Sequence, residues 1–152
     1  MRWIEDGRTP TFEESRRAIE GFERSWAQHG VGLFALEEKV SAELIGFVGL
    51  SIPNFLPEIL PSVEIGWRLA RHAWGKGFAT EGACAALSFG FSRPELERIV
   101  SIHQLGNVGS GRIMRKLGMR LERETVHPSN KRPLRVYEIS RADWRRTQSS
   151  SA

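Results

Sequence analysis

The sequence has a single cysteine, Cys84, among its 152 residues, so no disulfide bond can form within the chain. This excludes a disulfide-stabilised secreted scaffold and fits a reducing compartment best. No apolar run approaches the ~20 residues that span a bilayer. The N-terminal segment also lacks an apolar stretch of the signal-peptide type. We therefore expect a cytoplasmic protein without a membrane partner.

Metal-ligand spacing and the common nucleotide motifs are also absent. The four histidines are scattered, with no cysteine or carboxylate at metal-ligand spacing, so we expect no metal. Neither the G-x-x-x-x-G-K-[ST] pattern nor the dinucleotide G-x-G-x-x-G pattern occurs.

The chain length predicts one domain, which we place at residues 1–146. The Ser-rich tail, residues 147–152, is expected to be disordered.

The charge is uneven along the chain. From Asn107 onward there are 11 basic and 4 acidic residues, of 22 and 18 in the whole sequence. Such asymmetry indicates nucleic acid or another polyanion, a small anionic ligand such as a nucleotide phosphate, or simply a solvated arginine-rich surface. No basic run carries the interleaved aromatic residues that single-strand binders need. We therefore do not expect a nucleic-acid partner.

The order of elements predicts an α/β (α+β) domain. Thr11 to Glu14 form a capping box before a helix that Gly30 ends. Pro94 limits the second helix, and Gly118 ends the third. The expected order is helix, three strands, helix, strand, helix and two strands, which gives a mixed sheet. The predicted strands are 31–37, 44–52, 63–69, 99–103, 119–125 and 134–139, and the two later helices are 80–91 and 110–117.

A glycine-rich turn carries the strongest chemical signal. Trp74-Gly-Lys-Gly-Phe-Ala-Thr80 lies between a strand and a helix. Glycines there allow a tight turn and a close approach of backbone to ligand. The free N–H groups and the positive end of the helix suit a pyrophosphate, and Lys76 adds a mobile charge. The alternative is that the glycines only shape the turn.

A second segment, Asn107–Met119, follows a strand and opens a helix. Asn107 or Ser110 can cap this helix, and Ile113, Met114 and Leu117 give it an apolar face. Taken alone, the segment is a capped amphipathic helix with a glycine stop.

The two segments together resemble the GNAT acetyltransferase superfamily. W-G-K-G-F-A-T-E is followed about 30 residues later by N-x-x-S-x-x-x-M-x-K-L-G-M. Glu64-Ile-Gly-Trp-Arg-Leu69 and Gly46-Phe-Val-Gly-Leu50 are similar to the branch that contains the RimJ/RimL-type ribosomal-protein N-terminal acetyltransferases. The resemblance covers about Thr11 to Trp144. It implies a GNAT-like acyl-CoA N-acyltransferase fold with two splayed parallel strands, here 63–69 and 99–103.

The resemblance also implies the cofactor site. Acetyl-CoA would lie between the splayed strands, with its pyrophosphate on the backbone of the glycine turn. Asn107 and the Leu69 backbone would support the pantetheine arm. The cofactor-binding residues implied are Leu69, Trp74, Gly75, Lys76, Gly77, Phe78, Ala79, Thr80, Asn107 and Arg112.

Acetyl transfer to a primary amine needs a base, because an ordinary amine is protonated near neutral pH. Glu64, on the splayed strand, is the candidate general base. The alternative is a strand-end charge that faces solvent or pairs with an arginine. Ser110 matches the family serine near the CoA sulfur, although it is also a good helix cap. His103 is an alternative base or a structural histidine, and Asn54, Phe55 and Trp67 are candidate substrate residues.

The resemblance therefore implies an acetyl-CoA-dependent N-acetyltransferase, a monomer or homodimer that acts on a protein N-terminus or a small amine metabolite. Family members normally have a strand and a helix before the capped helix, and we expect this chain to lack both. An absent first strand would leave a sheet edge unpaired. A catalytically inactive acyl-CoA-binding protein and a basic nucleic-acid-binding module remain the alternative functions.

Overall fold

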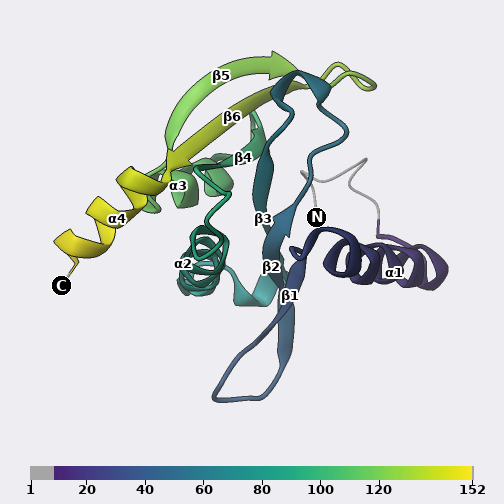
Figure 1. Cartoon of the computed structure of the whole chain (residues 1–152). Coiled ribbons are helices and arrows are strands. Elements are labelled where there is room, and N and C mark those ends of the chain that lie inside the picture. The colour runs from purple at the N-terminus through teal and green to yellow at the C-terminus, as the bar shows by residue number, and fades with distance from the viewer. Residues whose placement is uncertain (1–8, 152) are drawn as a thin grey trace.

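The computed structural model describes residues 9–151 of the chain. These residues form a six-stranded sheet with four α-helices (Figure 1). The elements in chain order are α1 (Phe12–His29), β1 (Leu33–Glu37), β2 (Leu44–Ser51), the short helix η1 (Pro57–Ile59), β3 (Val63–Leu69), η2 (Arg71–Ala73), α2 (Phe78–Phe91), β4 (Arg98–Gln104), α3 (Val108–Lys116), β5 (Arg120–Val126), β6 (Pro133–Ser140) and α4 (Arg141–Ser150).

The sheet is mixed, with strand order β1-β2-β3-β4-β6-β5. All neighbouring strands are antiparallel except β3 and β4, which are parallel. The expected mixed α/β architecture is therefore confirmed. Within residues 9–151, β1 pairs with β2 alone, so its outer edge carries no strand.

Helix α1 has the ends that its sequence predicts. The Thr11 side chain accepts a hydrogen bond from the Glu14 N–H, and the Glu14 side chain accepts one from the Thr11 N–H. Gly30 ends the helix with a left-handed backbone, φ 65°. Phe22 of α1 packs against Phe47 of β2, with 5.5 Å between ring centroids.

The main core lies on the other face of the sheet, under α2 (Figure 1). Leu50 and Ile65 of the sheet pack with Ala83 and Leu87 of α2, and all four are almost completely buried. A second, smaller cluster is formed by Leu56, Ile59, Val100 and Val136. Because Val100 alternates with the core residue Ile99 along β4, this cluster lies on the face opposite α2.

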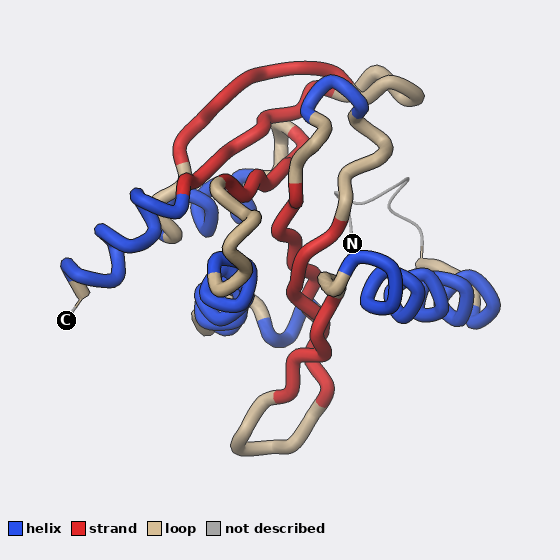
Figure 2. The backbone as a smooth tube through the Cα atoms, viewed as in Figure 1, coloured by secondary structure: helices blue, strands red, loops and turns tan. Residues whose placement is uncertain are grey.

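The β2–β3 loop is held against the β5–β6 hairpin, and Figure 2 shows the two segments side by side. Phe55 stacks on His127, with ring centroids 5.3 Å apart. The Thr125 hydroxyl donates to the Glu58 carboxylate, and Arg123 also pairs with Glu58 at 3.6 Å. The loop is thus fixed over the second cluster by side chains from a distant part of the sequence.

The parallel strands β3 and β4 separate after two residue pairs. Val63 pairs with Ile99 and Glu64 with Val100, and the register ends there. β3 nevertheless continues along β2 to Leu69, and β4 along β6 to Gln104. The buried Ser101 hydroxyl donates to the Ile65 carbonyl at 2.8 Å, which gives that oxygen a partner where backbone pairing stops. The expected splay between strands 63–69 and 99–103 is confirmed.

The C-terminal helix α4 differs from the sequence prediction. Residues 147–150, expected in a disordered tail, continue α4 to Ser150. The helix starts because the Ser140 hydroxyl caps the Asp143 N–H, and the buried Trp144 packs at 6.5 Å from Phe91. Serine hydroxyls near its end donate to carbonyls one turn earlier. The compositional signal for disorder was therefore wrong for residues 147–150, because tertiary packing anchors the helix.

No helix within residues 9–151 combines the length and the apolar composition required to cross a membrane.

We expect Ser101→Ala to lower the free energy of unfolding by about 1–3 kcal/mol, because the buried Ile65 carbonyl loses its donor. Chemical denaturation measures the change. Ser88→Ala is the control, because Ser88 is exposed on α2. Equal stability of the two variants would contradict a structural role for the hydrogen bond between the splayed strands.

Candidate active site

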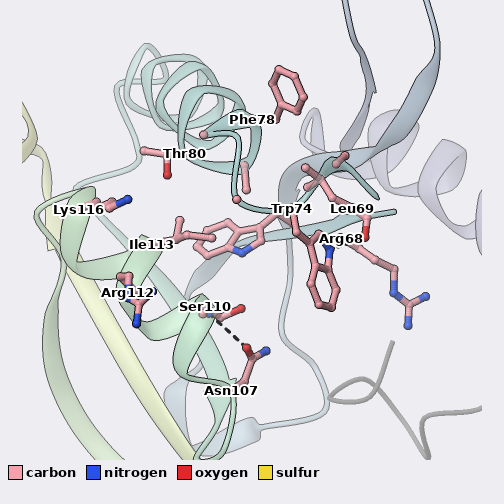
Figure 3. Close-up of a pocket in the computed structure, with 16 residues that line it drawn as sticks. Arg68, Leu69, Trp74, Phe78, Thr80, Asn107, Ser110, Arg112, Ile113 and Lys116 are labelled. Carbon is pink, nitrogen blue, oxygen red and sulfur yellow. Dashed lines mark hydrogen bonds between the residues drawn. The ribbon is translucent and has the colours of Figure 1, made fainter. Parts of the chain in front are cut away.

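A cavity of about 380 Å³ opens where β3 and β4 separate (Figure 3). Its walls come from the end of β3, the glycine turn, the start of α2 and the start of α3. The residues that line it are Trp67, Arg68, Leu69, Ala73, Trp74, Gly75, Gly77, Phe78, Ala79, Thr80, Asn107, Gly109, Ser110, Arg112, Ile113 and Lys116. The two segments that the sequence singled out, 74–80 and 107–119, thus meet across one cavity.

The glycine turn presents open backbone to this cavity. Gly75 and Gly77 have left-handed φ angles of 72° and 82°. A Cβ atom built on either residue meets nothing within 4 Å, so the turn leaves free space above its peptide groups. Gly77 is the N-cap of α2, and no side chain in the described part of the chain caps the helix. The N–H groups of its first turn are therefore available to an anion, at the positive end of the helix dipole.

The opposite wall is the N-terminus of α3. The Asn107 Oδ1 accepts a hydrogen bond from the Ser110 N–H at 3.2 Å, so Asn107 is the cap of this helix (Figure 3). The Ser110 hydroxyl is left for another partner. Arg112 and Lys116 follow on α3, so both ionisable side chains that this wall contributes to the cavity are basic. Such a lining suits a ligand with several negative charges.

The Trp74 side chain belongs to the wall of the cavity and is about half exposed. Its Nε1–H donates to the Leu69 carbonyl at 2.9 Å, and the Arg71 guanidinium lies 5.6 Å from the ring centroid. The indole therefore bonds to the backbone of Leu69, which the family resemblance assigns to the pantetheine arm.

Glu64 lies at the closed end of the splay, in the last residue pair before the strands separate. It is not part of the cavity lining. The register places it between Ser51 of β2 and Val100 of β4, on the face that carries the second apolar cluster. The residue keeps partial solvent contact, but the carboxyl group is surrounded by protein, and this burial raises its pKa to about 7. Burial is the cause, since no positive side chain among the described residues offsets it.

His103 lies under α3 rather than in the cavity. Its Nδ1 bonds with the Gln104 carbonyl oxygen at 2.7 Å. Its Nε2 is buried without a partner in the described part of the chain, and a Cβ on Gly111 would come within 3.1 Å of it. Burial, opposed in part by the bond to Gln104, lowers the pKa of His103. This placement fits the structural reading of the residue better than the reading as a base.

The structure brings together most of the predicted site residues. Ser110 and all the predicted cofactor residues except Lys76 line the cavity. Of the candidate substrate residues, Trp67 lines it, whereas Asn54 and Phe55 belong to the loop over the opposite face. Sequence reasoning missed Arg68, Ala73, Gly109, Ile113 and Lys116. Arg68 could have been found from its two-residue spacing to Gly66 and Glu64 on one strand face.

No group of three His, Cys, Asp or Glu side chains in the range 9–151 could hold a metal ion.

Comparisons with known proteins agree with this geometry. The family model described as "Acetyltransferase (GNAT) domain" matches residues 1–120. YkkB of Bacillus subtilis (strain 168) is 33% identical over 125 residues, which is 82% of this chain and 70% of YkkB. The N-acetyltransferase YnaD of the same organism is 44% identical over 59 residues, 39% of this chain and 35% of YnaD.

Solved structures share the fold. A putative GNAT-family acetyltransferase from Bordetella pertussis has a TM-score of 0.78 at 22% identity, over 89% of this chain and 81% of that one. The ribosomal-protein-S5-alanine acetyltransferase of Vibrio fischeri has a TM-score of 0.73 at 19% identity (93% and 80%). The spermidine N-acetyltransferase of Vibrio cholerae, solved with CoA and spermine, has a TM-score of 0.69 at 21% identity (90% and 79%).

We expect Gly77→Asn to weaken acetyl-CoA binding at least about tenfold, because the side chain fills the space above the turn. Asparagine tolerates the left-handed backbone better than other non-glycine residues. Gly30→Asn, at a left-handed helix end outside the cavity, is the control for backbone strain. Calorimetric titration measures both, and an unchanged affinity in Gly77→Asn would refute the phosphate-cradle interpretation.

The raised pKa of Glu64 predicts a pH effect on stability. The folded state holds the proton up to about pH 7, whereas the unfolded carboxyl group loses it near 4.5. The stability that Glu64 contributes is therefore full below pH 4.5 and is lost as the pH rises to about 7. Relative to Glu64→Gln, the wild-type free energy of unfolding should fall over this window and then level off. Denaturant titrations from pH 4 to 8 measure it, with Glu37→Gln on the exposed part of β1 as the control. A constant difference across the window would contradict the burial of the carboxyl group.

Proposed function

The chain belongs to the GNAT acetyltransferase family, and on this premise we propose that it transfers the acetyl group of acetyl-CoA directly to a primary amine, with Glu64 as the general base. The acceptor is a protein N-terminus or a small amine metabolite. The acetyl group passes from acetyl-CoA to the amine in one step, without first bonding to an enzyme side chain.

One observation carries the proposal. A cavity with an exposed glycine turn, an uncapped helix N-terminus and basic side chains lies in the gap between β3 and β4, and a buried carboxyl group lies where that gap closes. The site therefore combines an anion-binding region with a proton acceptor, which are the two parts that acetyl transfer from a CoA thioester needs.

The cavity residues fit acetyl-CoA. The space above Gly75 and Gly77 would receive the pyrophosphate on the N–H groups of the turn and of the first turn of α2. Arg112 and Lys116 would balance further phosphate charge. Asn107 and the Leu69 backbone would hold the pantetheine arm.

The chemistry follows from protonation. Bound acetyl-CoA would supply the thioester carbonyl that the amine attacks. The attacking amine must lose a proton, and an α-amine or lysine amine is mostly protonated at pH 7. Glu64, with its pKa raised to about 7, takes that proton when the nitrogen bonds to the acetyl carbon. The Ser110 hydroxyl donates a hydrogen bond to the sulfur as the carbon–sulfur bond breaks.

We also propose that the chain belongs to the RimJ/RimL-like branch, whose ribosomal-protein enzymes acetylate protein N-termini. Support comes from the Glu64–Leu69 and Gly46–Leu50 motifs. The Vibrio fischeri and Vibrio cholerae neighbours are named as acetyltransferases of a ribosomal protein and of spermidine. Each of these two acceptors carries an amino group. Because both neighbours are below 25% identical to this chain, they support acetyl transfer to an amine without selecting one acceptor.

The direct test is free-thiol release from acetyl-CoA with a panel of amines and N-terminal peptides. Glu64→Gln should lower kcat by about 10²- to 10⁴-fold, because the general base is removed. The wild-type rate should rise with pH through about 7, and this step should disappear in the variant. Ser110→Ala should also lower kcat, whereas both variants should retain nearly full acetyl-CoA affinity.

Unchanged rates in both variants would remove the catalytic assignment. Acetyl-CoA binding without thiol release on any amine would instead favour the inactive acyl-CoA-binding protein.

A further inference from the structure

One face of β3 carries a carboxylate, a glycine and an arginine in alternation. Glu64, Gly66 and Arg68 are two residues apart, so their side-chain directions coincide. Ile65, the residue between the first two, belongs to the main core under α2. The face that carries Glu64 and Arg68 is therefore the opposite one, away from the helix whose N-terminus forms the phosphate cradle.

The strand surface between Glu64 and Arg68 is bare. Gly66 pairs with Gly49 of β2, so two residues without side chains lie next to each other there. A Cβ atom on Gly66 would meet nothing within 4 Å, whereas one on Gly49 would come within 2.3 Å of the Gly32 carbonyl oxygen. Among residues 9–151, nothing therefore fills the space above Gly66, two residues beyond the point where β3 and β4 separate.

No side chain among residues 9–151 pairs with Arg68 in a way that explains its position. Its Nε is buried and makes no hydrogen bond within residues 9–151. Most other described arginines, including Arg98, Arg123 and Arg141, pair with carboxylates. A buried donor without an acceptor costs free energy, so a ligand is the natural partner. The guanidinium group favours a carboxylate, which it can bind through two parallel hydrogen bonds.

Arg68 also lies away from the phosphate-binding end of the cavity. Figure 3 shows its guanidinium group pointing away from α3, which carries Asn107 and Ser110, and on the opposite side of the cavity from Thr80 and Lys116. Arg68 therefore lies on the same face of β3 as Glu64, the proposed general base, and so on the side from which an amine would approach.

We propose that the space above Gly66 is the acceptor site, and that Arg68 selects an amine that carries a carboxylate in the same molecule. The inference rests on the proposed acetyl transfer. The amine lies toward Glu64 and the carboxylate toward Arg68. Glu64 and Arg68 are four residues apart, roughly 13 Å along the strand, and Gly66 lies midway between them on the same face. The same cation disfavours acceptors with a second positive charge, such as polyamines.

The experiment compares acceptors in matched pairs, each offered as its carboxylate and as its carboxamide. β-Alanine and β-alaninamide represent small molecules, and peptides that begin with Asp or Asn represent protein N-termini. We expect kcat/KM to be at least about tenfold higher for the carboxylate than for the carboxamide of a pair. The pair with the larger preference shows whether the acceptor is a small molecule or a protein N-terminus. Equal kcat/KM within every pair, or faster transfer to spermidine, would overturn the proposal while leaving acetyl transfer intact.

Variants of Arg68 assign the preference to its guanidinium group. Arg68→Gln should raise KM for the carboxylate acceptors and abolish the preference, with kcat and acetyl-CoA affinity nearly unchanged. Arg68→Lys should restore part of it. Arg24→Gln, which removes one exposed positive charge from α1, is the control. A loss of acetyl-CoA affinity in Arg68→Gln equal to its effect on KM would place Arg68 in the coenzyme site and overturn the proposal.

Gly66→Leu tests the location of the acceptor. The side chain enters free space, so stability should be retained while the acceptor KM rises at least about tenfold. An unchanged KM would exclude this space as the acceptor site.

If no amine is acetylated, a binding experiment tests the site instead. The CoA-loaded protein is titrated with each carboxylate and each carboxamide, and tryptophan fluorescence measures the binding. Preferential binding of carboxylates that Arg68→Gln abolishes would support the site, and equal binding would refute it.

Discussion

The short parallel pairing of β3 with β4 is the constraint on which the rest of the structure depends. Two residue pairs and the Ser101–Ile65 hydrogen bond hold the strands together, and beyond them each strand follows its antiparallel neighbour. A sheet that remained paired to Leu69 would have no gap and no cavity. Because the strands separate, the glycine turn after β3 and the α3 N-terminus after β4 face each other, and Glu64 lies where the gap closes.

The sheet also divides the site into two sides. The face under α2 presents an uncapped helix end and basic side chains, which suit phosphate groups. The other face carries Glu64 beside the cluster of Leu56, Ile59, Val100 and Val136. Burial on that face raises the pKa of the Glu64 carboxyl group to about 7, so the same packing that stabilises the loop tunes the group that we propose as the general base.

Local signals made much of this fold predictable. The Thr11–Glu14 capping box and the Gly30 stop gave the first helix its bounds, and each of the six predicted strand ranges overlaps one of the strands β1 to β6. The meeting of segments 74–80 and 107–119 came from the family resemblance, because no local pattern encodes contacts between distant residues. Helix α4 was missed because it depends on Trp144 packing against Phe91, which lies more than 50 residues earlier in the chain.

The central claim is that the gap between β3 and β4 holds acetyl-CoA. Hydrogen exchange of the full chain with and without CoA tests it most directly, because backbone N–H groups form the proposed cradle. Bound CoA should slow the exchange of the backbone amides in residues 67–69, 75–80 and 107–111, with little change in α1 or α4. Saturating CoA that leaves these amides unprotected, or that protects a different surface, would contradict the central claim.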